Sequence, residues 1–361
     1  MYAMNRSHSA RPASPVPLEE AIVGQHPSVV QLRDLVARVA KSRAGIVLIY
    51  GETGSGKGLV ARCLHAQSAR AQQNFTEINC AAIPGNLLES ELFGHERGAF
   101  TGAVQRKAGL LEIARGGTVF LDEVRELDPV MQAKILTLLD SRHFRRIGAV
   151  EELSTDARFI AATNKILLSE VAAGRFRDDL YYRLQVVSIN IPPLRERGDD
   201  VFVLATQFLN KFNALHESRF VSIDPAVQDI FRQYHWPGNV RELSNLLERI
   251  CILEQGERIT EAHLPTRIIR EANTRRAATP GAVMPADSGQ ASLAGMAGHT
   301  DPTVPVPEAD GYMAQTARFQ AALIETALRE SGGSLAGAAE LLRLSRHALR
   351  HQMNKLGVTA Q

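Results

Sequence analysis

The 361-residue sequence contains only three cysteines, Cys63, Cys80 and Cys251, and they form no CxxC pair. A disulfide framework and a zinc ribbon are therefore excluded, and a reducing compartment fits. An excess of one charge is also missing, because 41 Lys and Arg stand against 39 Asp and Glu. No apolar run approaches the ~20 residues that span a bilayer, and the N-terminus lacks the apolar segment of a signal peptide. We expect a soluble, multi-domain cytoplasmic protein with no membrane partner.

Short apolar runs alternate with helical patterns between residues 21 and 200. These runs predict strands at Ile46–Tyr50, Phe75–Asn79, Thr118–Leu121, Arg158–Ala162 and Val186–Ile191. Nearly all-apolar strands separated by helices indicate an α/β domain whose parallel sheet is covered on both faces. Residues 201–270 show helical periods alone, which predicts a smaller helical subdomain after it.

A compositional break follows at residues 271–311, which contain no aromatic residue, no Ile and a single Leu, Leu293. Such a segment cannot bury enough apolar area to offset its ordering entropy, so we expect a flexible linker. Residues 312–361 resume helical periodicity and predict a small all-α domain. Residues 1–20 are expected to be a disordered lead, too short for a folded regulatory module.

A glycine-rich loop, Gly51-Glu-Thr-Gly-Ser-Gly-Lys57, lies between the first strand and a helix. This context favours a phosphate-binding loop, in which backbone N–H groups and Lys57 hold phosphate oxygens. A glycine-rich turn with a solvated lysine is the less favoured alternative. The residues expected to bind nucleotide are Gly51, Glu52, Thr53, Gly54, Ser55, Gly56, Lys57 and Gly58.

Gly58 departs from the usual pattern, because Ser or Thr at this position provides a hydroxyl for Mg²⁺. Asp122 and Glu123 end the third predicted strand, and we expect Asp122 to act on Mg²⁺ and Glu123 to polarise the attacking water. Thr163 and Asn164 follow the next strand and are expected beside this site, since ligands gather at the carboxyl ends of parallel strands. An Asx turn or a helix cap is the alternative for Asn164.

Two glycines bracket an aromatic residue in the segment Gly98-Ala-Phe-Thr-Gly-Ala103. This pattern predicts a mobile hairpin tip that exposes Phe100. An exposed Phe is costly unless it meets a partner. The alternative is a tight turn whose Phe folds back into the core.

The C-terminal domain carries a helix-turn-helix pattern. Residues 334–344 predict one helix, and Ser345, as an N-cap, begins a second. Leu349 and Met353 share one face of the second helix, and its other faces are polar and basic, which suits a DNA major groove. A helical bundle with a solvated basic face is the alternative. The residues expected to contact DNA are Ser345, Arg346, His347, Arg350, His351 and Lys355.

Taken together, these motifs resemble the bacterial enhancer-binding proteins, the AAA+ activators of RNA polymerase that contains sigma-54. The resemblance covers about residues 20–264 and 319–358, and the last segment resembles a Fis-type DNA-binding domain. Eight motifs occur in the family's order, and together they are highly specific. They are the phosphate loop, Asn79-Cys80-Ala81-Ala82, GAFTGA, GGTVFLDE, ATN, FRDDLYYRL, PPLRERGDD and WPGNVREL.

The resemblance also implies roles for single residues around the nucleotide. Asn79 resembles the residue that holds the catalytic Glu idle, and Thr163 with Asn164 resembles the first sensor. Arg241 resembles the second sensor, with a solvated arginine as the alternative.

Arg177 and Arg183 resemble the arginines that reach the γ-phosphate of a neighbouring subunit. Their alternative is ion pairing with Asp178 and Asp179. The family's sigma-54 contact loop corresponds to Gly98, Ala99, Phe100, Thr101, Gly102 and Ala103.

The resemblance therefore implies an ATPase that uses ATP and Mg²⁺ in a ring, expected to be a hexamer. It would bind upstream DNA and remodel the closed promoter complex of the sigma-54 RNA polymerase holoenzyme. As in the phage-shock and type III secretion activators, regulation is expected from a separate protein or from expression level. The alternative, favoured by Gly58, is a DNA-binding regulator that binds nucleotide for assembly without productive hydrolysis.

Overall fold

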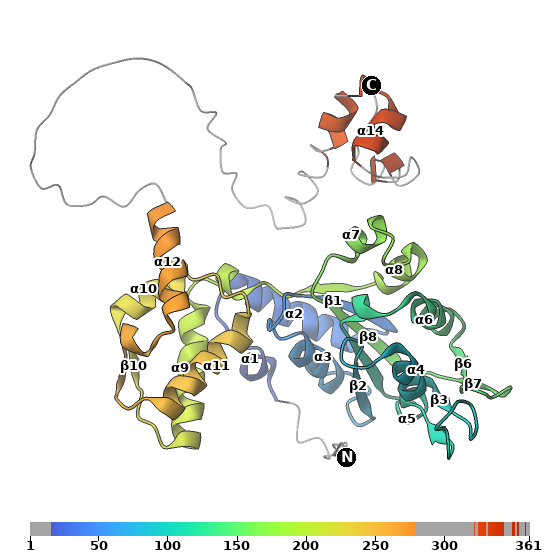
Figure 1. The fold of residues 1–361 in the computed structure, drawn as a ribbon, viewed down its shortest axis with the longest axis horizontal. Helices are drawn as coiled ribbons and strands as arrows, with labels where there is room; N and C mark the ends of the chain where they lie inside the picture. Colours follow the sequence, from blue (N-terminus) through green and yellow to red (C-terminus); the bar gives the residue numbers. More distant parts are fainter. Residues whose placement is uncertain are drawn as a thin grey trace, which may run out of the picture. The chain divides into compact units, whose positions relative to one another are not determined.

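The computed structural model divides the chain into two units, Met1–Ala282 and Val283–Gln361 (Figure 1). The structure describes residues 16–278, 321, 324–329, 331–342, 349, 350, 352, 353 and 358. Among these, no helix is both long and apolar enough to cross a membrane.

A five-stranded parallel sheet lies at the centre of the first unit, in the order β2-β5-β8-β1-β9. Its strands are β1 (Ile46–Tyr50), β2 (Phe75–Asn79), β5 (Thr118–Asp122), β8 (Arg158–Thr163) and β9 (Ser188–Asn190). All five predicted strands are confirmed. The last is shorter than predicted, because only Ser188–Asn190 pairs with β1.

Helices cover both faces of the sheet, because alternate strand residues point to opposite sides. Val47 and Ile49 pack with one helical layer, whereas Ile46 and Leu48 pack with the other. The first layer is formed by α1 (Leu18–Ala21), α2 (Pro27–Lys41) and α3 (Lys57–Ala66). The second contains α4 (Gly85–Phe93), α5 (Leu110–Ile113), α6 (Pro129–Ser141), α7 (Leu167–Ala172) and α8 (Asp178–Leu184).

Two short hairpins extend from the second layer. Strands β3 (Gly94–His95) and β4 (Lys107–Ala108) form one, and β6 (His143–Arg145) and β7 (Glu152–Ser154) form the other. The GAFTGA segment lies between the strands of the first hairpin.

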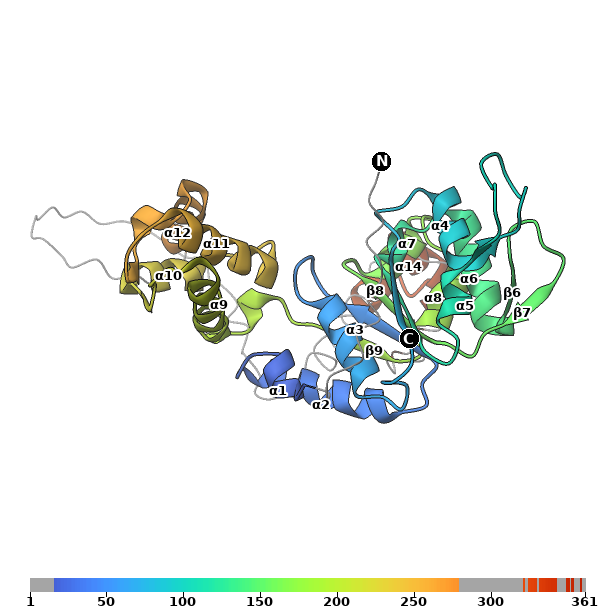
Figure 2. The same ribbon diagram turned by 90° about the horizontal axis from the view of Figure 1, so that it is seen from below.

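A separate helical cluster follows the sheet domain (Figure 2). It is formed by α9 (Asp200–His216), α10 (Pro225–Gln233), α11 (Asn239–Leu253) and α12 (Thr266–Ala278), with the fully buried Trp236 in its core. The short elements β10 (Ser222–Ile223), β11 (Arg258–Ile259) and η3 (Glu261–His263) connect these helices, and η2 (Leu194–Glu196) leads from β9 into α9.

Two expected boundaries were wrong by a few residues. The lead does not extend to residue 20, because α1 begins at Leu18, whose side chain packs in the apolar cluster against the sheet. The linker does not begin at residue 271, because α12 continues to Ala278. Ala272 is fully buried in the helical cluster, and this packing holds the helix beyond the compositional break. Residues 279–311 lie outside the described part of the chain.

In the second unit, α14 (Leu335–Leu341) begins after Ser334, whose hydroxyl accepts a hydrogen bond from Gly337 N at 3.3 Å. Leu349 and Met353 are both buried in one small apolar cluster with Ile324, Leu328 and Ala338. The predicted apolar face of the second helix is therefore confirmed at these two positions.

Candidate nucleotide-binding site and contact loop

The glycine-rich loop has a backbone that only glycine adopts readily. Gly54 and Gly56 have φ of 77° and 105°. A Cβ on Gly54 would lie 2.1 Å from the carbonyl oxygen of Gly238. Gly56 precedes α3, so the loop leads directly into the N-terminus of that helix, where free N–H groups favour an anion.

Lys57 is buried, which contradicts the alternative of a solvated lysine. Its ammonium group donates to the carbonyl oxygen of Gly51 at 3.1 Å and pairs with Glu123 Oε1 at 2.9 Å. The charge of Lys57 therefore lies inside the loop, where a phosphate oxygen would compete with Glu123 for it.

The carboxylate of Glu123 also contacts the end of β8, the strand beside β5. Its Oε2 accepts a hydrogen bond from Asn164 N at 3.2 Å, and Asn164 Nδ2 donates to Thr53 Oγ1 at 3.2 Å. Glu123 has a φ of 54°, a left-handed conformation that is rare for this residue type. Lys57, Glu123 and Asn164 thus meet at one edge of the sheet, as the sequence predicted, and Asn164 bonds across the site rather than within its own turn.

Asp122 is the last residue of β5. Burial, and then the charge of Glu123, raise the pKa of its carboxyl group above its ordinary value. A cation placed beside Asp122 would relieve both effects. Carboxylate oxygens are the ligands that Mg²⁺ prefers in proteins.

Two buried polar atoms around the loop, Ser55 Oγ and Asn164 Oδ1, have no hydrogen-bond partner among the residues that the structure describes. Buried polar groups are normally hydrogen-bonded. The Ser55 hydroxyl could donate a hydrogen bond to a phosphate oxygen, and the Asn164 amide oxygen could accept one from a water molecule that attacks the phosphate. No cluster of three His, Cys, Asp or Glu that could hold a metal occurs in the described ranges, so a magnesium ion here would need phosphate oxygens to complete its shell.

Two predicted residues lie near this site but bond elsewhere. Asn79 Oδ1 accepts from Ala81 N at 2.9 Å, while Glu123 is held by Lys57 and Asn164. Thr163 is fully buried, and its hydroxyl accepts from Lys165 N at 3.3 Å.

Both candidate trans-acting arginines are partly exposed and ion-paired. Arg177 Nε and Nη2 lie 3.0 and 2.7 Å from the two carboxylate oxygens of Asp179, as the alternative interpretation predicted. Arg183 Nε lies 2.8 Å from Asp140 on α6, a partner that the sequence did not indicate. Surface pairs of this kind are worth only ~0–1 kcal/mol, so they do not fix the arginines against a stronger anion.

The helical subdomain contacts the glycine-rich loop directly. Asn239 is completely buried at the start of α11, and its Nδ2 donates to Glu52 Oε2 at 3.0 Å and to the carbonyl oxygen of Thr53 at 3.1 Å. Arg195 forms a double hydrogen bond with Glu52, at 2.8 and 2.6 Å, and holds the pKa of that carboxyl group below its ordinary value. Neither Asn239 nor Arg195 was singled out from the sequence, although both lie inside quoted motifs.

Arg241 extends from the first turn of α11, and its backbone N–H donates to the carbonyl oxygen of Gly54 at 3.3 Å. In the described part of the chain, its guanidinium has no hydrogen bond or ion pair. It lines a pocket of about 450 Å³ that also contains Thr53, Gly238 and Arg249. A free arginine at the rim of a phosphate loop suits an anionic ligand.

The GAFTGA segment forms a tight tip on the β3–β4 hairpin. Gly98 and Gly102 have φ of 78° and 107°, and Gly98 N donates to the carbonyl oxygen of Ala103 at 2.8 Å. Phe100 remains 40% exposed, and its ring packs edge-on with that of His95, at 5.0 Å between ring centroids. Phe100 is therefore not folded into the core, and the predicted exposed aromatic tip is confirmed.

A buried arginine, which the sequence did not reveal, ties the base of this tip to the β6–β7 hairpin. Arg146 Nη1 lies 3.0 Å from Glu96 Oε1, and its Nε and Nη2 lie 2.9 and 2.6 Å from Glu112. Ile147 and Gly94 add a backbone hydrogen bond of 3.0 Å between the two segments. The base of the β3–β4 hairpin is therefore coupled to the loop that joins β6 and β7.

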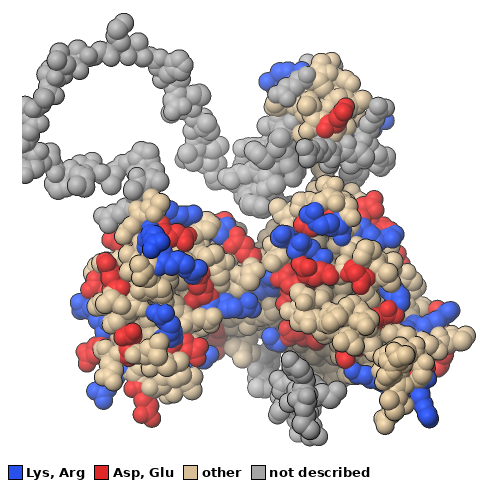
Figure 3. Space-filling model, in the orientation of Figure 1, with Lys and Arg blue, Asp and Glu red and all other residues tan. Residues whose placement is uncertain are grey.

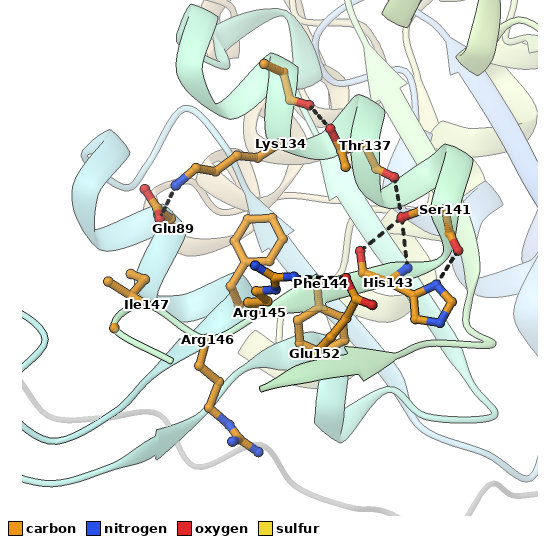
Figure 4. A pocket seen from close by; sticks show the side chains of 13 residues that line it. Glu89, Lys134, Thr137, Ser141, His143, Phe144, Arg145, Arg146, Ile147 and Glu152 are labelled. Carbon is orange, nitrogen blue, oxygen red and sulfur yellow. Dashed lines mark hydrogen bonds and ion pairs between the residues drawn. The ribbon is translucent and has the colours of Figure 1, made fainter. Parts of the chain in front are cut away.

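A second pocket, of about 700 Å³, is lined by residues of α4, α6 and the β6–β7 hairpin (Figure 4). Lys134 and Glu89 pair beside it, and Arg145 pairs with Glu152 at 3.7 Å. These lining charges are thus ion-paired, unlike the guanidinium of Arg241 at the phosphate loop.

Lys and Arg are interspersed with Asp and Glu on the face of the molecule that Figure 3 shows. Of the six residues expected to contact DNA, the structure describes Arg350, which is exposed and helical. The other five lie outside the described residues.

A parallel sheet, a phosphate loop, paired carboxylates and a helical lid define a P-loop domain of the AAA+ class. Residues 22–190 match the Sigma-54 interaction domain, residues 195–280 the AAA+ ATPase lid domain, and residues 315–356 the bacterial regulatory protein, Fis family. The chain belongs to the sigma-54-dependent enhancer-binding proteins, which combine an AAA+ domain with a helix-turn-helix DNA-binding domain.

Relatives share most of this chain. The transcriptional regulatory protein ZraR of Escherichia coli is 47% identical over 247 residues, which cover 68% of this chain and 56% of ZraR. The regulatory protein AtoC of Escherichia coli is 38% identical over 337 residues, covering 93% of this chain and 68% of AtoC. The crystal structure of NtrX from Brucella abortus in complex with ATP has a TM-score of 0.63 at 32% identity, covering 93% of this chain and 69% of that chain.

Proposed function

We propose that this protein is an ATP-hydrolysing activator of sigma-54 RNA polymerase that works as a ring, expected to be a hexamer, on upstream DNA. The observation that carries the proposal is the meeting of Lys57, Glu123 and Asn164 beside a phosphate loop that carries an unpartnered Ser55 hydroxyl. The ATP-bound structure of the related NtrX supports nucleotide as the ligand.

The residues divide the work of hydrolysis among them. The loop amides and Ser55 would bind phosphate oxygens, and Lys57 would leave Glu123 for the β- and γ-phosphates. The freed carboxylate of Glu123, positioned by Asn164 N, would accept a hydrogen bond from the attacking water. Asp122 would help to hold Mg²⁺, which would supply charge neutralisation on the γ-phosphate.

The arginines and the lid would complete the site. Arg241 faces the phosphate loop of its own chain, so it can follow the nucleotide state and move α11. Arg177 and Arg183 would exchange Asp179 and Asp140 for the γ-phosphate of a neighbouring subunit. Each active site would then be complete only in an assembly.

The exposed tip at Phe100 supports a protein partner for the β3–β4 hairpin, and by family this partner is sigma-54. The C-terminal helix-turn-helix unit would bind upstream DNA through Arg350 and its basic neighbours.

The test is the ATPase rate per subunit as a function of protein concentration, for the wild type and for Glu123→Gln. A rate that rises with concentration and is lost in the variant supports an assembled ATPase. Tight ATP binding without turnover at any concentration would instead favour a regulator that uses nucleotide only for assembly, the alternative that Gly58 suggests.

A further inference from the structure

Gly58 lies in the first turn of α3, and the space beside it is large enough for a Cβ atom. A Cβ built on Gly58 would lie 3.7 Å from Arg62 Nη2, 3.8 Å from Phe120 Cε1 and 3.9 Å from Glu77 Oε1. These are ordinary van der Waals distances, so a side chain could be accommodated. The missing side chain therefore has a functional rather than a packing consequence, because this position normally serves Mg²⁺.

The carboxylate of Glu77 borders this space from the neighbouring edge strand. Glu77 lies on β2 and is paired in register with Phe120 of β5. Its Oε2 accepts a hydrogen bond from Arg62 Nη1 at 2.6 Å, and its Oε1 is the oxygen that faces Gly58. Arg62, one helical turn after Gly58, thus holds a carboxylate from another strand next to the place where residue 58 would carry a Ser or Thr hydroxyl.

Glu77 also lies on the same side of the sheet as the carboxylate of Asp122. Asn79 is in register with Asp122 and Glu77 with Phe120, and residues two apart in a strand share a face. Phe120 packs in the apolar cluster of α2 and α3. Glu77 and Asp122 therefore share the face of the sheet that α3 covers.

We propose that Glu77, held by Arg62, compensates for the side-chain oxygen that position 58 lacks and orients the waters of the magnesium ion that accompanies ATP. Magnesium keeps several of its waters when it binds to a protein with phosphate. Carboxylates beyond the direct ligands tune metal affinity by hydrogen-bonding those waters. Glu77 is thus a positioning residue, and the inference rests on the proposed ATPase function.

The experiment uses the full chain and compares Glu77→Gln, Glu77→Ala and two double variants. Gly58→Glu in the Glu77→Ala background returns a carboxylate to the same space from α3, where Arg62 can still pair with it. Gly58→Ala in that background is the matched control, since it adds a side chain without charge. Because Arg62 and Glu77 form an exposed pair, the variants should melt close to the wild type.

The first readout is binding of a fluorescent ATP analogue during a magnesium titration, with a parallel series in EDTA. The second is the Mn²⁺ EPR signal of the protein with ADP. We expect Glu77→Gln and Glu77→Ala to raise the half-saturating metal concentration roughly 10-fold, the lower end of such outer-shell effects, with affinity in EDTA unchanged. In the Glu77→Ala background, Gly58→Glu should restore the half-saturating metal concentration of the wild type, and Gly58→Ala should not.

If ATP binding by Glu77→Gln depends on magnesium in the same way as binding by the wild type, the inference is overturned. The proposed ATPase function still stands in that case, provided that the wild type itself binds ATP in a magnesium-dependent way. Equal losses with metal and in EDTA also overturn it, because they indicate a general effect on the loop. If the wild type neither binds nor hydrolyses ATP, the proposed function fails and the inference falls with it.

Discussion

Lys57 Nζ and Glu123 Oε1 lie 2.9 Å apart, so the residue suited to hold phosphate neutralises the residue suited to activate water. Glu123→Gln removes this competitor for Lys57 and also removes the base. We expect ATP affinity to be kept or increased and turnover to fall by ~10²-fold or more, the usual contribution of such a group. Equilibrium binding and phosphate release measure the two effects, with Lys57→Ala as the control that should lose binding. Turnover within threefold of the wild type would contradict the role of Glu123.

Arg183 is expected to act on the active site of another subunit. Arg183→Ala should lose ATPase activity, whereas Asp140→Asn, which breaks the same ion pair but keeps the arginine, should retain it. The free energy of unfolding of both variants should lie within about 1 kcal/mol of the wild-type value, because the ion pair is exposed. Mixing Arg183→Ala with Glu123→Gln should recover part of the activity, since some interfaces then combine an intact Glu123 with an intact Arg183. No recovery in the mixture would argue for action within one chain.

Phe100 is expected to serve a partner rather than the fold. Phe100→Ala should leave ATPase activity and melting temperature nearly unchanged, because Phe100 is 40% exposed and its ring packs edge-on with that of His95 at the hairpin tip. Transcription from a sigma-54 promoter in vitro should be lost. Val104→Ala, at a more exposed position of the same hairpin, is the matched control and should remain active. Loss of ATPase activity in Phe100→Ala would show that the tip supports the fold.

Asp122 illustrates a conflict between stability and function. Its folded-state pKa is raised, so its charged form is less favourable in the folded than in the unfolded chain. This cost is present at neutral pH, begins to fall as the pH drops to the raised pKa, and is gone below the pKa of the unfolded chain. Asp122→Asn should therefore melt above the wild type at pH 7 in EDTA, with a smaller difference at lower pH, and should lose turnover. The exposed Asp140→Asn is the control, and a lower melting temperature for Asp122→Asn would refute the prediction.

Asn239 is expected to link nucleotide binding to the lid. Its Oδ1 accepts from Leu194 N at 2.8 Å, in addition to the bonds that its amide group donates to the loop. Asn239→Ala leaves a buried N–H without a partner and should cost about 1–3 kcal/mol in unfolding free energy. Asn245→Ala, on the exposed face of the same helix, should have little effect. Thermal melts with and without ATP test this, and equal melts of the two variants would contradict it.

The elements that the sequence predicted well are those with local causes. Strands β1, β5 and β8 were found because each is a run of mostly apolar residues that the fold buries, and the loop at Gly51–Lys57 because glycine spacing dictates its backbone. The strand that ends at Asn79 was predicted correctly. The hydrogen-bond partner of the Asn79 side chain was not, because it depends on the geometry of a single turn.

Contacts between distant segments could not be predicted in this way. The pairing of Arg183 with Asp140 and of Arg146 with Glu112 joins residues whose spacing carries no periodic signal. Asn239 lies in a quoted motif, yet its role follows from burial against the loop, which one sequence does not reveal. The helical extent of α12 was missed because Ala272 is buried by tertiary packing despite an apolar-poor context.

The close approach of Gly54 to Gly238 has a consequence for building chimaeras from relatives. A loop that carries any side chain at position 54 would collide with a backbone carbonyl, which cannot rotate away as a side chain can. The two segments lie far apart in the sequence, yet they must be exchanged as one cassette. In a shuffled library, a crossover between positions 54 and 238 would keep this contact only when both parent proteins bring the same two backbone segments equally close together.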